Sequence, residues 1–284
     1  MADETNGPNS EQIDYWNGDA GDKWVDAQER LDPVLEGMGL LGMDQGGVNP
    51  GERVIDIGCG CGATSLELAR RVGPMGSVLG VDISSPMLRR AAERAAAESL
   101  GHAVFANADA SSYQFEEGAA DLVFSRFGVM FFRNSDEAFT NIRRGMRPGG
   151  RLCFVCWQPL IKNAWVTLPR DIALRHVPPP EPPNPDDPGP FAFADPAKVE
   201  GILGRAGFSD AAMTPYDTTM YHLGSVEEVT HFMIYFGPAS RLLEEADNDV
   251  KTTVEAEVRA EIAARHDGEG VAFPAAVWVA TATT

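Results

Sequence analysis

The chain has 284 residues, of which 44% are hydrophobic, and its 42 acidic against 23 basic side chains give a formal charge of -19. A chain of this length can bury a sizeable core without disulfides or metals. The negative charge repels phosphate backbones and anionic lipids, so we expect neither nucleic acid nor a membrane surface as a partner. The polar start and the lack of a long apolar run predict no signal peptide and no membrane span, and hence a cytoplasmic protein.

The first predicted elements are helical. Apolar residues recur at helical spacing over residues 10–43, and Gly18, Gly21 and Pro33 interrupt them. This pattern predicts two or three short helices. A glycine-rich stretch at 46–51 ends the region.

The next part of the chain alternates between strand and helix patterns. Strands are predicted at 53–57, 77–82, 103–107, 121–125 and 151–157, and helices at 63–72, 85–100 and 135–146. Ser85 and Pro86 supply an N-cap and a first-position proline for the second of these helices. This alternation predicts a doubly wound, parallel α/β sheet whose ligand lies at the carboxyl ends of the first strands.

The regular alternation ends at Trp157. The next predicted elements are a helix at 163–176, a proline-rich loop at 178–190 and a helix from Asp195-Pro196 to about 206. They are followed by a strand at 208–223, a helical stretch at 225–266 broken at Gly237-Pro238, and a strand at 271–283. We therefore expect N-terminal helices in 1–47 that cover the ligand and a sheet core in 48–157. A proline-rich cap insertion in 158–194 is followed by 195–284, which completes the sheet and adds helical cap elements at about 225–266.

The four cysteines form a C-x-C and a C-x-x-C pair, a spacing that metal sites also use. Cys59 and Cys61 fall within a glycine-rich loop. Cys153 and Cys156 lie on a predicted strand, where a spacing of three points them to opposite faces. We therefore predict reduced, structural thiols and no metal site.

The strongest motif runs from Asp56 to Gly62, reads D-x-G-x-G-x-G and lies between a buried strand and a helix. Glycines at 58, 60 and 62 allow the backbone to approach a nucleotide-like ligand closely. Together with Ala63, the same letters also fit the dinucleotide pattern G-x-G-x-x-A. Asp56 argues against that ligand, because a carboxylate repels pyrophosphate and suits a cation.

This motif resembles the first motif of the class I S-adenosylmethionine-dependent methyltransferases, whose ligand carries an ammonium and a sulfonium group. The resemblance implies a Rossmann-like methyltransferase sheet with a mainly helical cap, and it places Asp56, Gly58, Gly60 and Gly62 at the cofactor. Asp82 lies 24 residues after Gly58. It resembles the acid that holds the ribose hydroxyls, and a carboxylate can accept two such hydrogen bonds.

Other positions extend the resemblance through residues 48–157. Ile83 and Met87 are similar to the residues that pack on the adenine face. Asp109 and Ala110 resemble the third-strand motif whose acid accepts the exocyclic amine of adenine. Ser125 lies at the matching end of the fourth strand and is assigned to the cofactor.

The residues that follow Ser125 are assigned to the substrate. Arg126 is expected to orient an anionic group of the acceptor, and Phe127 to exclude water. A pairing of Arg126 with a neighbouring acid is the alternative.

A narrower resemblance rests on Tyr15, Trp16 and Trp24 together with residues 125–130. These are similar to a bacterial subgroup of small-molecule methyltransferases related to the ubiquinone/menaquinone C-methyltransferases. Tyr15 and Trp24 are assigned to the cofactor site, where aromatic faces attract a sulfonium. A simple apolar stripe on docking helices is the alternative.

The resemblance implies methyl transfer from S-adenosylmethionine to a small molecule, with S-adenosylhomocysteine as the product. Two other functions remain open: an NAD(P)-dependent oxidoreductase on a Rossmann sheet, and a non-catalytic S-adenosylmethionine-binding protein. No catalytic residue is assigned, because alignment in a dry pocket can carry methyl transfer without a general base. The acceptor, its reacting atom and the oligomeric state are left open.

Overall fold

The computed structural model describes residues 9–182, 184, 186–237 and 239–284. The chain divides into two compact units. The first comprises Met1–Trp157, Asp186–Pro215 and Trp278–Thr284, and the second comprises Gln158–Pro185 and Tyr216–Val277. The units are therefore interleaved along the chain. Residues 1–8 and Pro238, which fall within predicted regions, lie outside the described residues.

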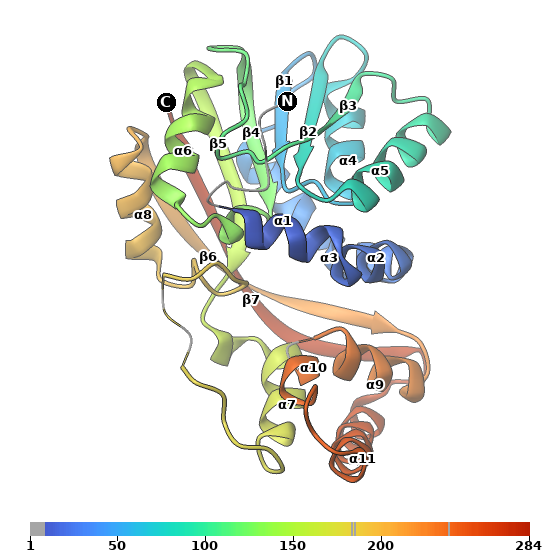
Figure 1. The fold of residues 1–284 in the computed structure, drawn as a ribbon. Coiled ribbons are helices and arrows are strands. Elements are labelled where there is room, and N and C mark those ends of the chain that lie inside the picture. The colour runs from blue at the N-terminus through green and yellow to red at the C-terminus, as the bar shows by residue number, and fades with distance from the viewer. Residues whose placement is uncertain (1–8, 183, 185, 238) are drawn as a thin grey trace. The chain divides into compact units, whose positions relative to one another are not determined.

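The described residues form a seven-stranded sheet in the order β3-β2-β1-β4-β5-β7-β6 (Figure 1). Its strands are β1 (Arg53–Ile57), β2 (Ser77–Asp82), β3 (Ala103–Asn107), β4 (Ala120–Arg126), β5 (Met146–Trp157), β6 (Ser209–Leu223) and β7 (Gly270–Thr283). From β3 to β5, neighbouring strands pair in parallel. The predicted doubly wound α/β sheet is confirmed, and its strand order reverses between β1 and β4.

Helices of the first unit lie beside this sheet. Figure 1 shows α4 (Ala63–Val72) and α5 (Ser85–Ala97) near β1–β3, and α6 (Ser135–Arg144) beyond β5. A short 3₁₀ helix, η2 (Val129–Phe131), follows β4, and α8 (Pro196–Arg205) packs on α6. The side chain of Asp195 accepts from the backbone N–H of Ala197 at 3.0 Å, so Asp195 caps α8 as predicted.

Three amino-terminal helices precede the sheet: α1 (Ser10–Asn17), α2 (Asp19–Asp26) and α3 (Gln28–Gly46). The predicted breaks at Gly21 and Pro33 are wrong. Gly21 lies within α2, where a Cβ would be 2.1 Å from the carbonyl oxygen of Trp16. Pro33 lies in the second turn of α3 on the exposed side, where water can replace the single hydrogen bond that proline removes.

The helix α3 lies unusually close to the sheet. A Cβ on Gly42 would be 2.6 Å from Val155 Cγ2, and the thiol of Cys153 donates to the carbonyl oxygen of Gly42. Glycine at this position therefore lets the helix backbone rest directly on β5.

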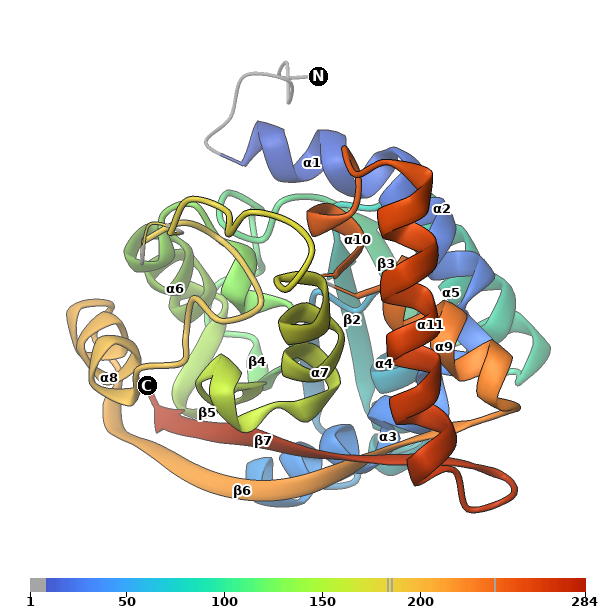
Figure 2. The same cartoon turned by 90° about the horizontal axis from the view of Figure 1, so that it is seen from below.

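The second unit contains η3 (Leu160–Lys162), α7 (Ala164–Ala173), α9 (Val226–Tyr235), α10 (Ala239–Leu242) and α11 (Asn248–Arg265), together with parts of β6 and β7 (Figure 2). It has an apolar core of its own. From α11, Val254, Val258 and Ile262 enter this core at a spacing of four, which aligns them on one helix face. The described residues between 178 and 190 form no helix or strand. No helix among the described residues is long and apolar enough to cross a bilayer.

Candidate functional site at the carboxyl ends of the first strands

The glycine-rich loop after β1 combines three glycines with positive φ: 68° at Gly58, 53° at Gly60 and 83° at Gly62. They serve different purposes. A Cβ on Gly58 would lie 2.6 Å from the Cα of Gly128, and one on Gly62 would lie 2.8 Å from Ala91 Cβ. At Gly60 the nearest atom is the sulfur of Met87 at 3.7 Å. Gly60 therefore presents bare backbone beside Met87, as a loop that cradles a ligand requires.

Asp82 ends β2 beside this loop and is only 8% exposed. Its Oδ2 accepts from the backbone N–H of Gly60, and its Oδ1 accepts from that of Ser84, both at 2.8 Å. Burial raises the pKa of this carboxyl group. The backbone N–H of Ile83 also interacts with this carboxylate. A carboxylate has about four lone-pair sites, so acceptor capacity remains for a ligand.

The start of α5 differs by one residue from the prediction. Ser84, not Ser85, is the N-cap residue, with Pro86 at the second helical position. The hydroxyl of Ser84 does not cap the helix but donates to the carbonyl oxygen of Trp16 at 2.7 Å. Ile83, half-buried, lies between Asp82 and this cap, and Met87 is 5% exposed.

Asp109 follows β3. Its Oδ1 accepts from the backbone N–H of Ser111, and its Oδ2 accepts from the side-chain amide of Asn9, both at 2.8 Å. The amide oxygen of Asn9 in turn accepts from the backbone N–H of Arg133, at 2.8 Å. Ala110 is buried next to Asp109. Asn9 was not among the predicted site residues. It directly precedes α1, where asparagine is a common capping residue, but its side chain makes no capping bond.

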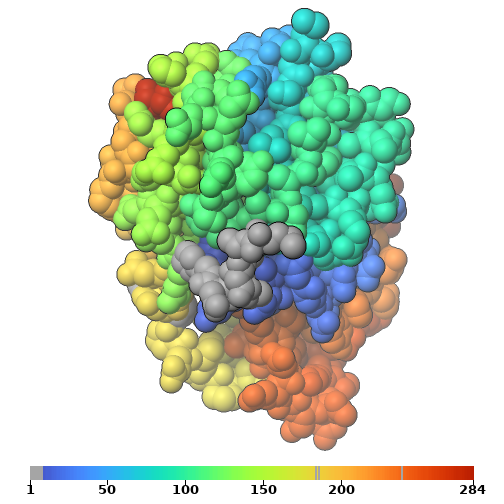
Figure 3. All heavy atoms as spheres, turned by 45° about the horizontal axis from the view of Figure 1, so that its top comes forward, coloured from blue at the N-terminus to red at the C-terminus, as the bar shows by residue number. Residues whose placement is uncertain are grey.

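Asn17 attaches the other end of α1. Its side-chain nitrogen donates to the carbonyl oxygen of Ile83 at 2.8 Å, and its oxygen accepts from the backbone N–H of Ser85 at 3.0 Å. Figure 3 shows the amino-terminal helices in dark blue directly beside the teal surface of the α5 region. Two asparagines thus tie α1 to the loops that follow β2, β3 and β4.

The predicted aromatic residues cluster around Trp16. Tyr15, Trp24 and Phe131 each pack edge-on against Trp16, with ring centroids 5.2, 5.8 and 5.7 Å away. Tyr15 is 46% exposed. Trp16 therefore brings α1 and α2 into contact with the segment after β4. It also lies between Tyr15 and Trp24, the two aromatic residues that were assigned to the cofactor site.

Asp56 lies beneath the loop and is fully buried. The hydroxyls of Thr64 and Ser65 donate to its Oδ2 at 2.7 and 2.6 Å, and its Oδ1 has no hydrogen-bond partner among the described residues. Burial raises the pKa of Asp56 to about 6, against the lowering effect of the two hydroxyls and the Arg126 guanidinium. Asp56 thereby ties β1 to the first turn of α4.

The three residues predicted at the end of β4 diverge. Ser125 is buried, and its hydroxyl accepts from the backbone N–H of Gly128 at 3.2 Å. The guanidinium of Arg126 donates to the carbonyl oxygen of Leu35 in α3 at 3.3 Å, and burial lowers its pKa. Phe127, at a φ of 63°, stacks on Trp157 with ring centroids 4.1 Å apart. The structure therefore does not bring Arg126 and Phe127 together on one surface.

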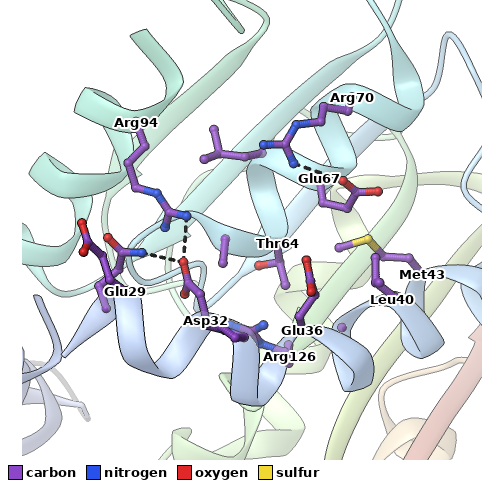
Figure 4. A pocket seen from close by; sticks show the side chains of 15 residues that line it. Glu29, Asp32, Glu36, Leu40, Met43, Thr64, Glu67, Arg70, Arg94 and Arg126 are labelled. Atoms are coloured by element: carbon purple, nitrogen blue, oxygen red, sulfur yellow. Dashed lines mark hydrogen bonds and ion pairs between the residues drawn. The ribbon is translucent and has the colours of Figure 1, made fainter. Parts of the chain in front are cut away.

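Arg126 instead reaches a cavity of about 350 Å³ between α3, α4 and α5 (Figure 4). Charged side chains line this cavity, and the ion pair of Arg94 in α5 with Asp32 in α3, at 2.7 Å, crosses it. A second ion pair, Arg70 with Glu67 at 3.1 Å, lies within α4. Arg126 alone among the residues predicted for the site lines it.

The four cysteines are buried and free, and burial raises the pKa of the Cys61 thiol to about 12. Among the described parts of the chain, no three His, Cys, Asp or Glu side chains gather closely enough to hold a metal ion.

Comparison with known proteins gives consistent results. Residues 54–150 match a family described as "Methyltransferase domain". Nocamycin O-methyltransferase of Saccharothrix syringae is 36% identical over 103 residues, which are 36% of this chain and 37% of that protein. A ubiquinone/menaquinone biosynthesis C-methyltransferase of Teredinibacter turnerae is 36% identical over 107 residues, covering 37% and 43% of the two chains. The match thus spans less than half the length of either curated relative.

A solved structure shares the fold. Phosphoethanolamine N-methyltransferase 2 of Haemonchus contortus, in complex with phosphomonomethylethanolamine and S-adenosylhomocysteine, superposes with a TM-score of 0.52. The two proteins are 20% identical, and the superposition covers 87% of this chain and 52% of the other.

Proposed function

We propose that this protein, whose residues 54–150 match a methyltransferase domain, is a class I S-adenosylmethionine-dependent methyltransferase that methylates a small-molecule acceptor. The observation that carries the proposal is the joint arrangement of Asp82 and Gly60. A buried carboxylate holds the bare backbone of the loop through Gly60 N–H and keeps acceptor sites for a pair of hydroxyls. A nucleoside ribose supplies such a pair.

The surrounding residues fit the rest of this cofactor. Asp109 retains lone pairs for an adenine amine, and Ile83 and Met87 offer apolar contact for an adenine ring. Asp56 contributes negative charge below the loop, which favours a cation over a pyrophosphate. The solved relative that binds S-adenosylhomocysteine supports the same assignment.

S-adenosylmethionine supplies a methyl group that its sulfonium makes electrophilic. The chain's residues would bind and orient the two reactants and exclude water. Tyr15 and Trp24, with Trp16 between them, would present aromatic faces to a sulfonium. Arg126 and Phe127 remain our candidates for the acceptor side. Arg126 is held by the carbonyl oxygen of Leu35, and Phe127 is held by stacking on Trp157. An acceptor atom that is nucleophilic once desolvated needs no general base.

A small-molecule acceptor has two supports. The matching curated relatives are named for nocamycin and for ubiquinone/menaquinone biosynthesis. The charge of -19 also disfavours a nucleic acid.

Calorimetric titration tests the proposal. S-adenosylmethionine and S-adenosylhomocysteine should bind, whereas NAD(H) and NADP(H) should not. Asp82→Asn should weaken binding roughly tenfold to hundredfold, because one acceptor oxygen is replaced by an NH2 donor and the other loses its charge. Asp121→Asn is the matched control, since Asp121 lies at the opposite end of the parallel strands, where it pairs with Arg147. Equal affinity in wild type and Asp82→Asn would remove Asp82 from the site.

Turnover is measured separately. S-adenosylhomocysteine should form when the protein is incubated with S-adenosylmethionine and a panel of small phenols, amines and activated carbon acids. Tight cofactor binding with no product across the panel would favour a non-catalytic binding protein. Binding of NAD(H) alone would favour the oxidoreductase.

A further inference from the structure

Arg94 of α5 makes two short hydrogen bonds in different directions. One terminal guanidinium nitrogen donates to the carbonyl oxygen of Cys61 in the glycine loop, and the other donates to Asp32 of α3, both at 2.7 Å. The Arg94 side chain is 20% exposed and that of Asp32 is 24% exposed. A pair so shielded from water is weakened less by solvent than a surface ion pair.

The loop is thereby held from two sides. Asp82 binds the N–H of Gly60, and Arg94 binds the carbonyl oxygen of the next residue, Cys61. The peptide between these two bonds contains Gly60, where a Cβ would meet only the sulfur of Met87, at 3.7 Å. Glycine backbone is intrinsically free to rotate, so the geometry of this peptide depends on such external bonds.

Asp32, the partner of Arg94 in α3, is also held in place. Asp32 accepts a second hydrogen bond from the side-chain amide of Gln28 at 2.6 Å, and Gln28 accepts from Arg90 at 3.0 Å. Gln28 is 6% exposed. Figure 4 shows Asp32 between Arg94 and the chain of α3. The start of α3 is therefore linked through Asp32 and Arg94 to the glycine loop.

From this we infer that Arg94 is a positioning residue for the cofactor loop and couples the docking of α3 to cofactor binding, a role that rests on the proposed function. Only a fork of donors can serve both acceptors at once. A lysine reaches one acceptor as a point charge and leaves the other without its partner. The pair Asp32 and Arg94 then acts as a unit, in which loss of either residue releases the loop.

The test compares Arg94→Gln, Arg94→Lys, Asp32→Asn and the Arg94→Gln/Asp32→Asn double variant. Arg90→Gln is the matched control: Arg90 lies one turn earlier on α5 and also bonds to α3, but within the described part of the chain it makes no hydrogen bond or ion pair with the loop. Hydrogen–deuterium exchange of the peptide covering 58–62 is measured without nucleotide, and the dissociation constant of S-adenosylhomocysteine is measured by calorimetry. Thermal unfolding shows whether each variant is folded.

We expect faster exchange at 58–62 in Arg94→Gln and Asp32→Asn than in Arg90→Gln. The dissociation constant should rise roughly tenfold in Arg94→Gln and less in Arg94→Lys. The double variant should be no weaker than the worse single variant, because both changes break one linkage. Under saturating acceptor, the loss should appear in the KM for S-adenosylmethionine and leave kcat nearly unchanged.

Wild-type exchange at 58–62 in Arg94→Gln would overturn the inference, as would equal affinity losses in Arg94→Gln and Arg90→Gln. These outcomes are separate from the fate of the proposed function. If wild type binds no S-adenosylhomocysteine, the proposed function fails, while the exchange measurement still decides whether Arg94 holds the loop.

Discussion

Gly58 and Gly128 face each other so closely that neither can carry a side chain. A Cβ on Gly58 would be 2.6 Å from the Cα of Gly128, and a Cβ on Gly128 would be 2.7 Å from the Cα of Gly58. The loops after β1 and β4 therefore meet through bare backbone at the point where the strand order reverses. Their separation at this point is set by two glycines and not by side-chain packing.

Gly128→Ala tests this contact. The φ of Gly128 is -86°, which alanine adopts readily, so the effect is steric. The added methyl would meet backbone atoms of Ile57 and Gly58, which cannot rotate away. We expect a loss of about 2 kcal/mol in unfolding free energy by urea titration, with weakened binding of S-adenosylhomocysteine. Gly101→Ala, where a Cβ meets nothing within 4 Å, should keep wild-type affinity.

Two glycines of α3 should respond in opposite directions to alanine. Gly42→Ala places a Cβ 2.6 Å from Val155 Cγ2 and should destabilise the protein by about 1–3 kcal/mol. Gly37 is exposed in the same helix, and a Cβ there meets no atom within 4 Å. Gly37→Ala should stabilise the protein by about 0.5–1 kcal/mol. Chemical denaturation measures both, and a shared sign would contradict the close docking of α3.

Asp56 should give the protein a specific pH dependence. Its pKa of about 6 lies above the ordinary value of 3.8, so the folded state keeps a proton that the unfolded chain has lost. Stability from this group therefore falls as the pH rises from about 4 to about 6 and stays low above that. Asp56→Asn removes the titration, so its stability relative to wild type should rise by about 1 kcal/mol between pH 5 and pH 7. A pH-independent difference in urea denaturation would rule out the raised pKa.

Asn9→Ala should loosen α1. It leaves Asp109 Oδ2 and the backbone N–H of Arg133 without the partner that Asn9 supplies, at a cost of about 1–3 kcal/mol in this contact. Hydrogen–deuterium exchange in residues 10–17 should accelerate, and S-adenosylhomocysteine should bind several-fold more weakly. In Asn49→Ala, which loses bonds only within its own turn, both measurements should match wild type. Unchanged exchange in Asn9→Ala would mean that Trp16 and Asn17 hold α1 without Asn9.

The strands and helices of the sheet could be predicted because each is encoded locally, by apolar periodicity and by the glycines and prolines that end it. The glycine loop and Asp82 could be predicted for the same reason, since one short motif and one strand end contain them. Asn9, Asn17 and Arg94 could not. Each acts on a loop at least 33 residues away in sequence, from 33 positions between Arg94 and Cys61 to 124 positions between Asn9 and Arg133. Only the folded chain brings such partners together.

The divergence of Arg126 and Phe127 could have been predicted in part, because successive residues of a regular strand point to opposite faces. The conformation of Phe127 could not. The positive φ of Phe127 was not encoded by any glycine signal, and its stacking on Trp157 joins residues 30 positions apart. Tertiary packing here overrides the local preference of a bulky residue for negative φ.

The glycine contact of α3 also determines which part of the amino-terminal region is able to yield. Because its backbone rests on β5 at Gly42, a slide of this helix by even one residue would force a larger side chain into a gap that has no room for a methyl group. The close contact at Gly42 therefore fixes the position of α3 along β5. Any displacement of α1 and α2 from the sheet would therefore have to bend the chain ahead of α3, at Ala27, and would carry Trp16 and Trp24 together because their rings pack on each other. A ligand that enters by this route would displace α1 and α2 while α3 keeps its place on β5.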